Sequence, residues 1–137
     1  MSKNKTILII GAKSDIALAV AKKFASEGYN LQLAARNSSK LDLVASDLKI
    51  RYEIDVSIYE LNILKYETFL DFIDSLDCLP DIALCAVGIL GNQKDDEKSF
   101  SNSVLVMRTN YEGPSLLLCE IANRFEIRGS GISFTSL

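Results

Sequence analysis

The sequence predicts a doubly wound α/β domain, in which helices cover both faces of a parallel sheet. Short apolar runs, typical of strands buried on both faces, alternate along the chain with segments whose apolar residues recur at helical spacing. The segments between the runs are long enough to hold the crossover helices that parallel strands require. At 137 residues and 48% hydrophobic content, the chain suits one domain with a packed core. We therefore expect a single domain over residues 1–137, with five strands in the order 3-2-1-4-5.

The chain before Pro80 predicts three pairs of a strand and a helix. The first run, residues 5–10, is rich in Ile and Leu and leads straight into Gly11. The next strands are expected over residues 31–35 and within residues 50–63, where the register is ambiguous. The helices are expected from Ile16 to the break at Gly28, over residues 39–48, and over residues 68–76.

The chain beyond Pro80 predicts two strands and one long helix. The strands are expected over residues 82–87 and 132–135, and the helix between them over residues 103–124. In the expected order, the sheet reverses its winding between the first and fourth strands, and such sheets bind ligands at the carboxyl ends of the strands there. The Gly11 loop and the segment after the fourth strand both fall at this edge, so we expect the functional site there.

Composition excludes several classes of function. The chain has no His, which excludes a Ser-His-Asp hydrolase and a zinc site with His ligands, and we expect no metal site. The net charge of −3 gives no argument for nucleic acid as a partner. The longest nearly apolar run, residues 82–90, is far shorter than the roughly 20 residues of a membrane span, and no signal peptide is evident. Three Cys without a C-x-x-C pair are typical of buried thiols, so a cytoplasmic location is expected.

The loop at Gly11 has the parts of a phosphate site. A helix N-terminus offers free N–H groups and a positive partial charge, and Gly11 permits the tight turn that leads into it. Asp15 is expected to be the N-cap of the helix that begins at Ile16. From these residues alone, an ordinary strand-to-helix turn and a nucleotide site both remain open.

Residues 10–17 resemble the T-G-x-x-x-G-I-G motif of the short-chain dehydrogenase/reductase family, in the branch whose loop is similar to G-A-x-S-D-I-A. Gly11 matches the first glycine, whereas Asp15 and Ala17 stand where the family has its second and third glycines. The resemblance implies a Rossmann-like fold and a dinucleotide cofactor. The loop residues that it implies at the cofactor are Gly11, Lys13, Ser14, Asp15 and Ile16.

Two further segments resemble the parts of the family that hold the adenosine half of the cofactor. Arg36 ends the second strand, where an acid is typical of relatives that bind NAD and a basic residue suits the 2′-phosphate of NADP. The resemblance therefore favours NADP over NAD, with a solvated arginine as the alternative. Asn62 and Ile63 resemble the segment beside the adenine, with an amide in place of the family's acid. Asp55 with Val56 is a rival match for that segment.

The segment Cys85-Ala86-Val87-Gly88 resembles the family's Asn-Asn-Ala-Gly. The resemblance implies that Ala86, Val87 and Gly88 lie beside the cofactor, where a glycine lets the backbone approach closely. Cys85 is interpreted as a small buried residue rather than a reactive thiol.

The segment T-N-Y-E-G-P in the long helix resembles the family's N-x-x-G-P, which makes Asn110 the counterpart of the catalytic asparagine. Pro114 has no N–H, so the usual helical hydrogen bond to the carbonyl of Asn110 cannot form. In the family this carbonyl holds a water of the proton relay; an incidental proline kink is the alternative. Ser136, in the segment G-S-G-I-S-F-T-S-L, is the counterpart of the catalytic serine.

The resemblance covers essentially the whole chain but only about the N-terminal half of a usual family member. No Tyr is followed four residues later by Lys, so the family's proton donor is absent, as are strands six and seven. The resemblance implies an NAD(P)-dependent oxidoreductase of a small carbonyl or alcohol substrate, represented by its cofactor-binding half through truncation or a frame error, and inactive by itself. A non-catalytic NADP(H)-binding module and a structural remnant remain as alternatives. The family's usual homo-oligomer is not expected of so short a chain.

Overall fold

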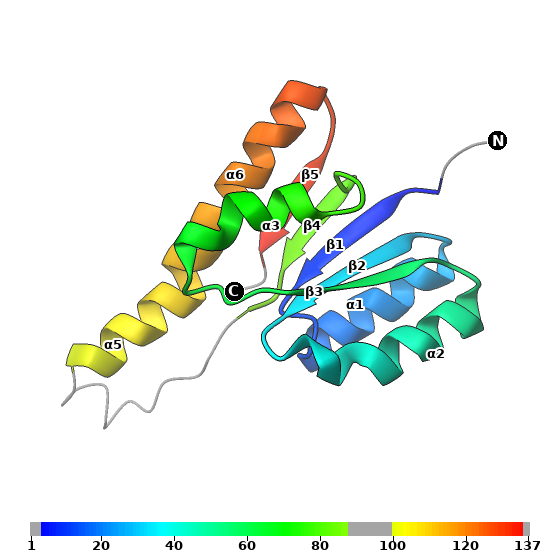
Figure 1. Ribbon diagram of the computed structural model, residues 1–137, viewed down its shortest axis with the longest axis horizontal. Coiled ribbons are helices and arrows are strands. Elements are labelled where there is room, and N and C mark those ends of the chain that lie inside the picture. The colour runs from blue at the N-terminus through cyan, green and yellow to red at the C-terminus, as the bar shows by residue number, and fades with distance from the viewer. Residues whose placement is uncertain (1–3, 88–99, 136–137) are drawn as a thin grey trace.

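The computed structural model describes residues 4–87 and 100–135. Within these ranges, five parallel strands form one sheet in the order β3-β2-β1-β4-β5 (Figure 1). The strands are β1 (Thr6–Ile10), β2 (Asn30–Ala35), β3 (Val56–Glu60), β4 (Ile82–Cys85) and β5 (Ile132–Thr135). The predicted fold class and strand order are confirmed.

Helices cover both faces of this sheet. They are α1 (Asp15–Ser26), α2 (Asp42–Tyr52), α3 (Phe69–Ser75), α5 (Phe100–Met107) and α6 (Gly113–Arg128). α1 and α2 lie on one face, and α3 and α6 lie on the other (Figure 1). Short 3-10 turns, Ser38–Leu41 and Tyr66–Thr68, precede α2 and α3. In the described ranges, no helix has the length and apolar character needed to cross a membrane.

The central strand β1 belongs to two cores. Ile7 and Ile9 pack with α1 and α2, whereas Leu8 and Ile10 pack with α3 and α6. All five residues of β1 are buried. A strand covered on both faces buries both sets of its side chains, so its sequence lacks the polar alternation of a half-exposed strand.

The structure settles the bounds of one strand that the sequence left ambiguous, and it changes the ends of two other elements. β3 occupies residues 56–60 of the ambiguous stretch and pairs with β2 from Leu31↔Val56 onward. β4 ends at Cys85, two residues early, because the chain turns toward the Gly11 loop once the N–H of Ala86 has bonded to the carbonyl of Ile10. α2 runs past residue 48, since no helix-breaking residue follows, and ends where Glu53 adopts a left-handed conformation (φ 54°).

The long helix expected over residues 103–124 extends from 100 to 128 and is interrupted. A π-helical turn, Arg108–Glu112, joins α5 to α6. The N–H of Gly113 donates to the carbonyl of Arg108, five residues back. Pro114 follows directly and has no N–H to donate, so the wider turn lies where the regular series of hydrogen bonds is broken. The π turn thus lies just before Pro114, while the predicted loss of the hydrogen bond to the carbonyl of Asn110 stays a prediction.

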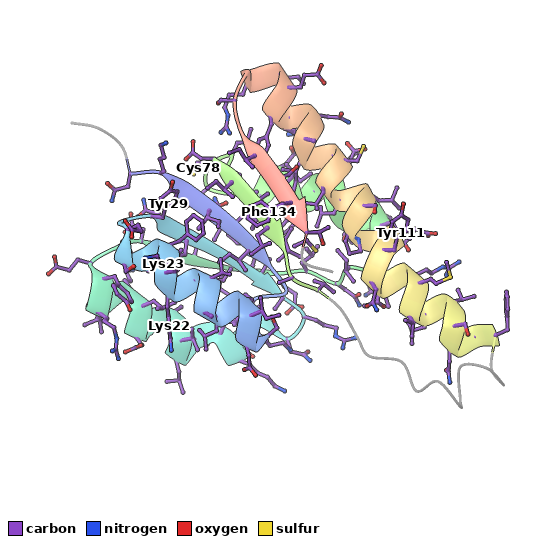
Figure 2. All side chains as sticks on the ribbon, turned by 180° about the vertical axis from the view of Figure 1, so that it is seen from behind. Lys22, Lys23, Tyr29, Cys78, Tyr111 and Phe134 are labelled. Atoms are coloured by element: carbon purple, nitrogen blue, oxygen red, sulfur yellow. The ribbon has the colours of Figure 1, made fainter. Side chains whose placement is uncertain are left out.

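The edge strand β5 leaves apolar side chains exposed. Ile132 is 61% exposed and Phe134 is 44% exposed. Ile132 pairs with Ile82, a residue of the core beneath α1 and α2, and Phe134 points to the same side because side chains two apart share a face. Figure 2 shows Phe134 on this side, away from α6.

Candidate functional site

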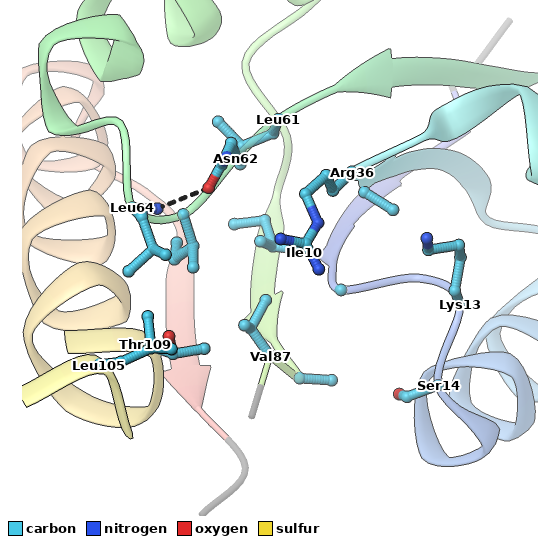
Figure 3. Close-up of a pocket in the computed structure, with 14 residues that line it drawn as sticks. Ile10, Lys13, Ser14, Arg36, Leu61, Asn62, Leu64, Val87, Leu105 and Thr109 are labelled. Atoms are coloured by element: carbon cyan, nitrogen blue, oxygen red, sulfur yellow. Dashed lines mark hydrogen bonds between the residues drawn. The ribbon is translucent and has the colours of Figure 1, made fainter. Parts of the chain in front are cut away.

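A cavity of about 330 Å³ opens at the carboxyl ends of β1 to β4 (Figure 3). It lies at the edge predicted for the functional site, where the strand order reverses between β1 and β4. Eight of the residues that the sequence predicts at a cofactor line it, namely Gly11, Lys13, Ser14, Arg36, Asn62, Ile63, Ala86 and Val87. Segments far apart in the chain therefore meet here as the sequence predicts.

The loop after β1 passes very close to the segment after β4. Gly11 has a φ of +83°, and a Cβ placed on it would stand 2.9 Å from the backbone of both Ala86 and Val87. The N–H of Gly11 donates to the carbonyl of Ala34 at 2.8 Å, which holds the loop against β2. Only glycine satisfies both the left-handed backbone and this close approach. The Gly11 loop, packed tightly against residues 86–87, forms the floor of the cavity.

The N-terminus of α1 faces this floor, but its cap is not the expected residue. Ser14 is the N-cap, and its Oγ accepts a hydrogen bond of 3.1 Å from the N–H of Ala17. The expectation that Asp15 caps the helix is wrong, because Asp15 is already the first helical residue and its charge instead favours the helix dipole. Neither Asp15 nor Ile16 is among the cavity-lining residues, and Ile16 is 63% exposed.

Two cationic side chains, Arg36 and Lys13, border the cavity on the β2 side. Figure 3 shows the Arg36 guanidinium extending over the cavity near Ile10. Among the described residues, Arg36 has no acidic partner within ion-pair distance.

The loop of residues 36–38 is held by Glu60 at the end of β3. Its carboxylate accepts hydrogen bonds of 3.0 Å from the N–H of Asn37 and from the N–H of Ser38. These N–H groups, that of Ser38 above all, and the positive charge of Lys13 hold the pKa of Glu60 below its usual value.

The loop after β3 forms the opposite wall. The Oδ1 of Asn62 accepts a 3.0 Å hydrogen bond from the N–H of Leu64, which makes a tight turn (Figure 3). Asp55 and Val56 lie at the other end of the strand, where the carbonyl of Asp55 bonds to the N–H of Leu31. Of the two rival matches for this segment, the structure therefore brings Asn62 and Ile63 to the cavity.

Sequence reasoning missed six lining residues. They are apolar or small side chains at strand ends and in the helical segment: Ile10, Ala35, Leu61, Leu64, Leu105 and Thr109. Leu105 lies in α5 and Thr109 in the π turn that follows it, and no motif in the sequence marks either of them. Thr109 is buried, whereas its neighbour Asn110 is half-buried and is not a lining residue.

Two predicted residues lie outside the described ranges, namely Gly88 and Ser136. Cys85 is fully buried, and burial raises the pKa of its thiol, so it packs as a small core residue, as interpreted from the sequence. In residues 4–87 and 100–135, no group of three acidic or Cys side chains is placed to hold a metal ion.

Comparison with known proteins identifies the family. The model of the short chain dehydrogenase family matches residues 5–135, so the chain belongs to that family. The chain is 27% identical over 130 residues to an uncharacterised oxidoreductase of Mycobacterium tuberculosis, and the match covers 91% of this chain and 51% of that protein. The chain thus spans about half the length of the curated relative it matches.

Two solved structures share the Rossmann-like fold. The NADPH-dependent 3-quinuclidinone reductase from Rhodotorula rubra has a TM-score of 0.86 at 19% identity, over 97% of this chain and 52% of that one. A 3-oxoacyl-[acyl-carrier protein] reductase with bound NAD from Brucella melitensis also has a TM-score of 0.86, at 16% identity, over 97% of this chain and 53% of that one. At these identities the likeness shows the fold.

Proposed function

We propose that this chain is the cofactor-binding part of an NAD(P)-dependent short-chain oxidoreductase, with NADP(H) as the favoured cofactor. One observation carries the proposal. Gly11 packs closely against residues 86–87 at the cavity, and Arg36 lines the same cavity without a salt bridge to any described residue. A glycine turn that leads into a helix N-terminus lets backbone N–H groups face a pyrophosphate, and a 2′-phosphate needs a cation. The residues present therefore fit the cofactor.

Each wall of the cavity has a role in this proposal. The Gly11 loop and the N-terminus of α1 hold the pyrophosphate, for which Ser14 keeps the first turn of the helix in order. Arg36, with Lys13 close by, binds the 2′-phosphate. Asn62 retains its amide N–H groups for the adenine edge while its Oδ1 is engaged by Leu64.

The nicotinamide end of the cofactor, which carries the hydride when bound, belongs beside residues 86–88 in this proposal. Asn110 is proposed to hold a water of the proton relay and Ser136 to polarise the substrate carbonyl, both by resemblance. The 137 residues contain no Tyr-x-x-x-Lys. We therefore expect this chain alone to bind cofactor without turning over a small carbonyl or alcohol substrate, because general acid catalysis contributes roughly 10²–10⁴-fold. Residues 1–137 act as one binding domain, and the cytoplasm is the proposed location.

The test is a fluorescence titration of the chain with NADPH and with NADH. We expect a micromolar dissociation constant for NADPH and weaker binding of NADH. Arg36→Ala should weaken NADPH binding at least tenfold, or about 1.4 kcal/mol, and leave NADH unchanged. Arg51→Ala is the matched control, because Arg51 pairs with Asp47 on the exposed side of α2.

Three outcomes would contradict the proposal. If neither cofactor binds, the chain is a structural α/β domain. If Arg36→Ala and Arg51→Ala behave alike, Arg36 is a solvated surface residue and the preference for NADP fails. Oxidation of NADPH by this chain with small ketones, at rates typical of enzymes, would contradict the expected lack of turnover.

A further inference from the structure

Both carboxylate oxygens of Glu60 accept hydrogen bonds from the loop that carries Arg36. Oε2 accepts from the N–H of Asn37 and Oε1 accepts from the N–H of Ser38, both at 3.0 Å. The two hydrogen bonds join the end of β3 to the loop after β2, across 22 and 23 positions of sequence. Hydrogen bonds from N–H groups to a charged acceptor are stronger than neutral ones, although solvent weakens these two because Glu60 is exposed.

The backbone of the loop is shaped to receive this carboxylate. Asn37 is in the left-handed region, with φ 56° and ψ 53°, and Ser38 begins the following 3-10 turn. A left-handed residue followed by a right-handed one turns successive N–H groups toward one point, where an anion binds. Asn adopts the left-handed conformation more readily than most residues with a side chain, and the bound carboxylate adds to this preference.

These two hydrogen bonds help to fix the position of the Arg36 backbone. Ala35 pairs with Glu60 in the β2–β3 ladder, so Arg36 is the first residue beyond the paired strand. Its backbone is held from one side by the ladder and from the other by the two N–H groups that Glu60 binds. The charge of Glu60 is balanced locally by those N–H groups and by Lys13, and Arg36 makes no ion pair with it among the described residues.

We propose that Glu60 is a positioning residue for cofactor specificity: by binding the N–H groups of Asn37 and Ser38, it fixes the loop in the form that directs Arg36 over the cavity. The inference rests on the proposed function, since it concerns the arginine that would bind the 2′-phosphate. A glutamine at this position would present an amide NH₂ to one of the two N–H groups, and the loop would lose half of its anchor. Arg36 would then spend more of its time away from the cavity, and discrimination in favour of the 2′-phosphate would fall.

The test uses two probes that differ only in that phosphate, adenosine 2′,5′-bisphosphate and adenosine 5′-monophosphate. Isothermal titration of the full chain gives the ratio of their dissociation constants for the wild type, for Glu60→Gln and for Glu126→Gln. Glu126 is an exposed carboxylate near the end of α6, so its variant controls for the lost charge. We expect Glu60→Gln to reduce the preference for the bisphosphate about tenfold, and Glu126→Gln to leave it unchanged.

The ratio separates positioning from mere stability. A purely structural role for Glu60 would weaken both probes equally and leave the ratio intact, which would overturn the inference. A ratio that rises in Glu60→Gln would also overturn it, because the carboxylate would then compete with the phosphate. If Glu60→Gln does not fold, Glu60→Asp is measured instead; it keeps the charge but is too short to reach both N–H groups, so the same fall is expected.

The failure of this inference differs from that of the proposed function. If the wild type binds neither probe, or binds both equally, the assignment of the cavity or of Arg36 is wrong, and the role of Glu60 is wrong with it. If the wild type prefers the bisphosphate and Glu60→Gln keeps the preference, only the role of Glu60 is wrong.

Discussion

The carbonyl oxygen of Ile63 lies 2.5 Å from the point where a Cβ on Gly113 would stand. This contact joins the loop that forms one wall of the cavity to the π turn between α5 and α6. Gly113 has an ordinary helical φ of −59°, so its backbone would accept any residue. Glycine is needed here for the space and not for the conformation, because backbone packs directly against backbone.

Gly113→Ala is therefore expected to destabilise the protein. Alanine in place of glycine inside a helix usually stabilises by about 0.5–1 kcal/mol, but overpacking costs about 1–3 kcal/mol, so we expect a net loss of roughly 1–2 kcal/mol. Urea unfolding followed by circular dichroism measures it. Ser115→Ala, on an exposed position of the same helix, is the control and should change little. A stabilised Gly113→Ala variant would show that the contact with Ile63 relaxes freely.

Gly11→Ala tests the close packing of Gly11 against residues 86–87 at the cavity. Gly129 offers a matched control, because its φ of +85° carries the same conformational strain while nothing lies within 4 Å of an added Cβ. In both Gly11→Ala and Gly129→Ala, the free energy of unfolding should fall by about 1 kcal/mol because alanine is strained in the left-handed region. In Gly11→Ala it should fall by roughly 1–3 kcal/mol more, because the added Cβ collides with residues 86–87. We also expect NADPH binding to fall more than tenfold in Gly11→Ala alone. Equal losses of stability and binding in both variants would mean that the collision is harmless.

Ser14→Ala removes the N-cap of α1. The expected loss in the free energy of unfolding is about 1 kcal/mol, the usual value of a serine cap. Asp15→Ala removes only a favourable charge in the first turn and should cost less, about 0.3–1 kcal/mol and less still in high salt. Chemical denaturation at low and high salt distinguishes the two. A larger loss for Asp15→Ala would restore Asp15 as the cap.

The lowered pKa of Asp77 predicts that the free energy of unfolding decreases at acidic pH. Burial alone raises its pKa, but hydrogen bonds from Gln32 Nε2 at 2.6 Å, Tyr59 OH at 2.9 Å and Ser57 Oγ at 3.2 Å outweigh burial and leave the pKa lowered. A lowered pKa in the folded state means that this stabilisation is complete above the ordinary value of 3.8 and is lost as the pH falls through the folded value.

Asp77→Asn should therefore flatten the fall in stability below pH of about 4. It should cost only about 0.5–1 kcal/mol at neutral pH, because an amide group cannot accept every bond but the exposed position weakens each of them. Urea unfolding at a series of pH values gives both quantities. Asp71→Asn, an exposed carboxylate in α3, is the control. If the free energy of unfolding falls as steeply with acid in Asp77→Asn as in the wild type, other carboxylates cause the acid dependence.

Several features of this protein were determined by local sequence. The apolar run of β1 predicts a central strand, because a strand that is covered by helices on both faces has apolar side chains on both faces. Gly11 predicts a tight turn into a helix, and Arg36 at the end of β2 predicts a cation at the same edge, because parallel strands end together there. These are properties of short segments and their order, and eight of the predicted cofactor residues line one cavity for this reason.

Other features were decided only by tertiary structure. Ser14 and Asp15 are both good N-caps, and the choice between them depends on where the chain leaves the turn at Gly11. Asp55 and Asn62 both match the family's segment beside the adenine in sequence, and the pairing of β3 with β2 decides which one reaches the cavity. The tie from Glu60 to Asn37 and Ser38 joins two strands that are distant in sequence. Such contacts depend on the register of paired strands and on backbone dihedrals, which no single segment contains.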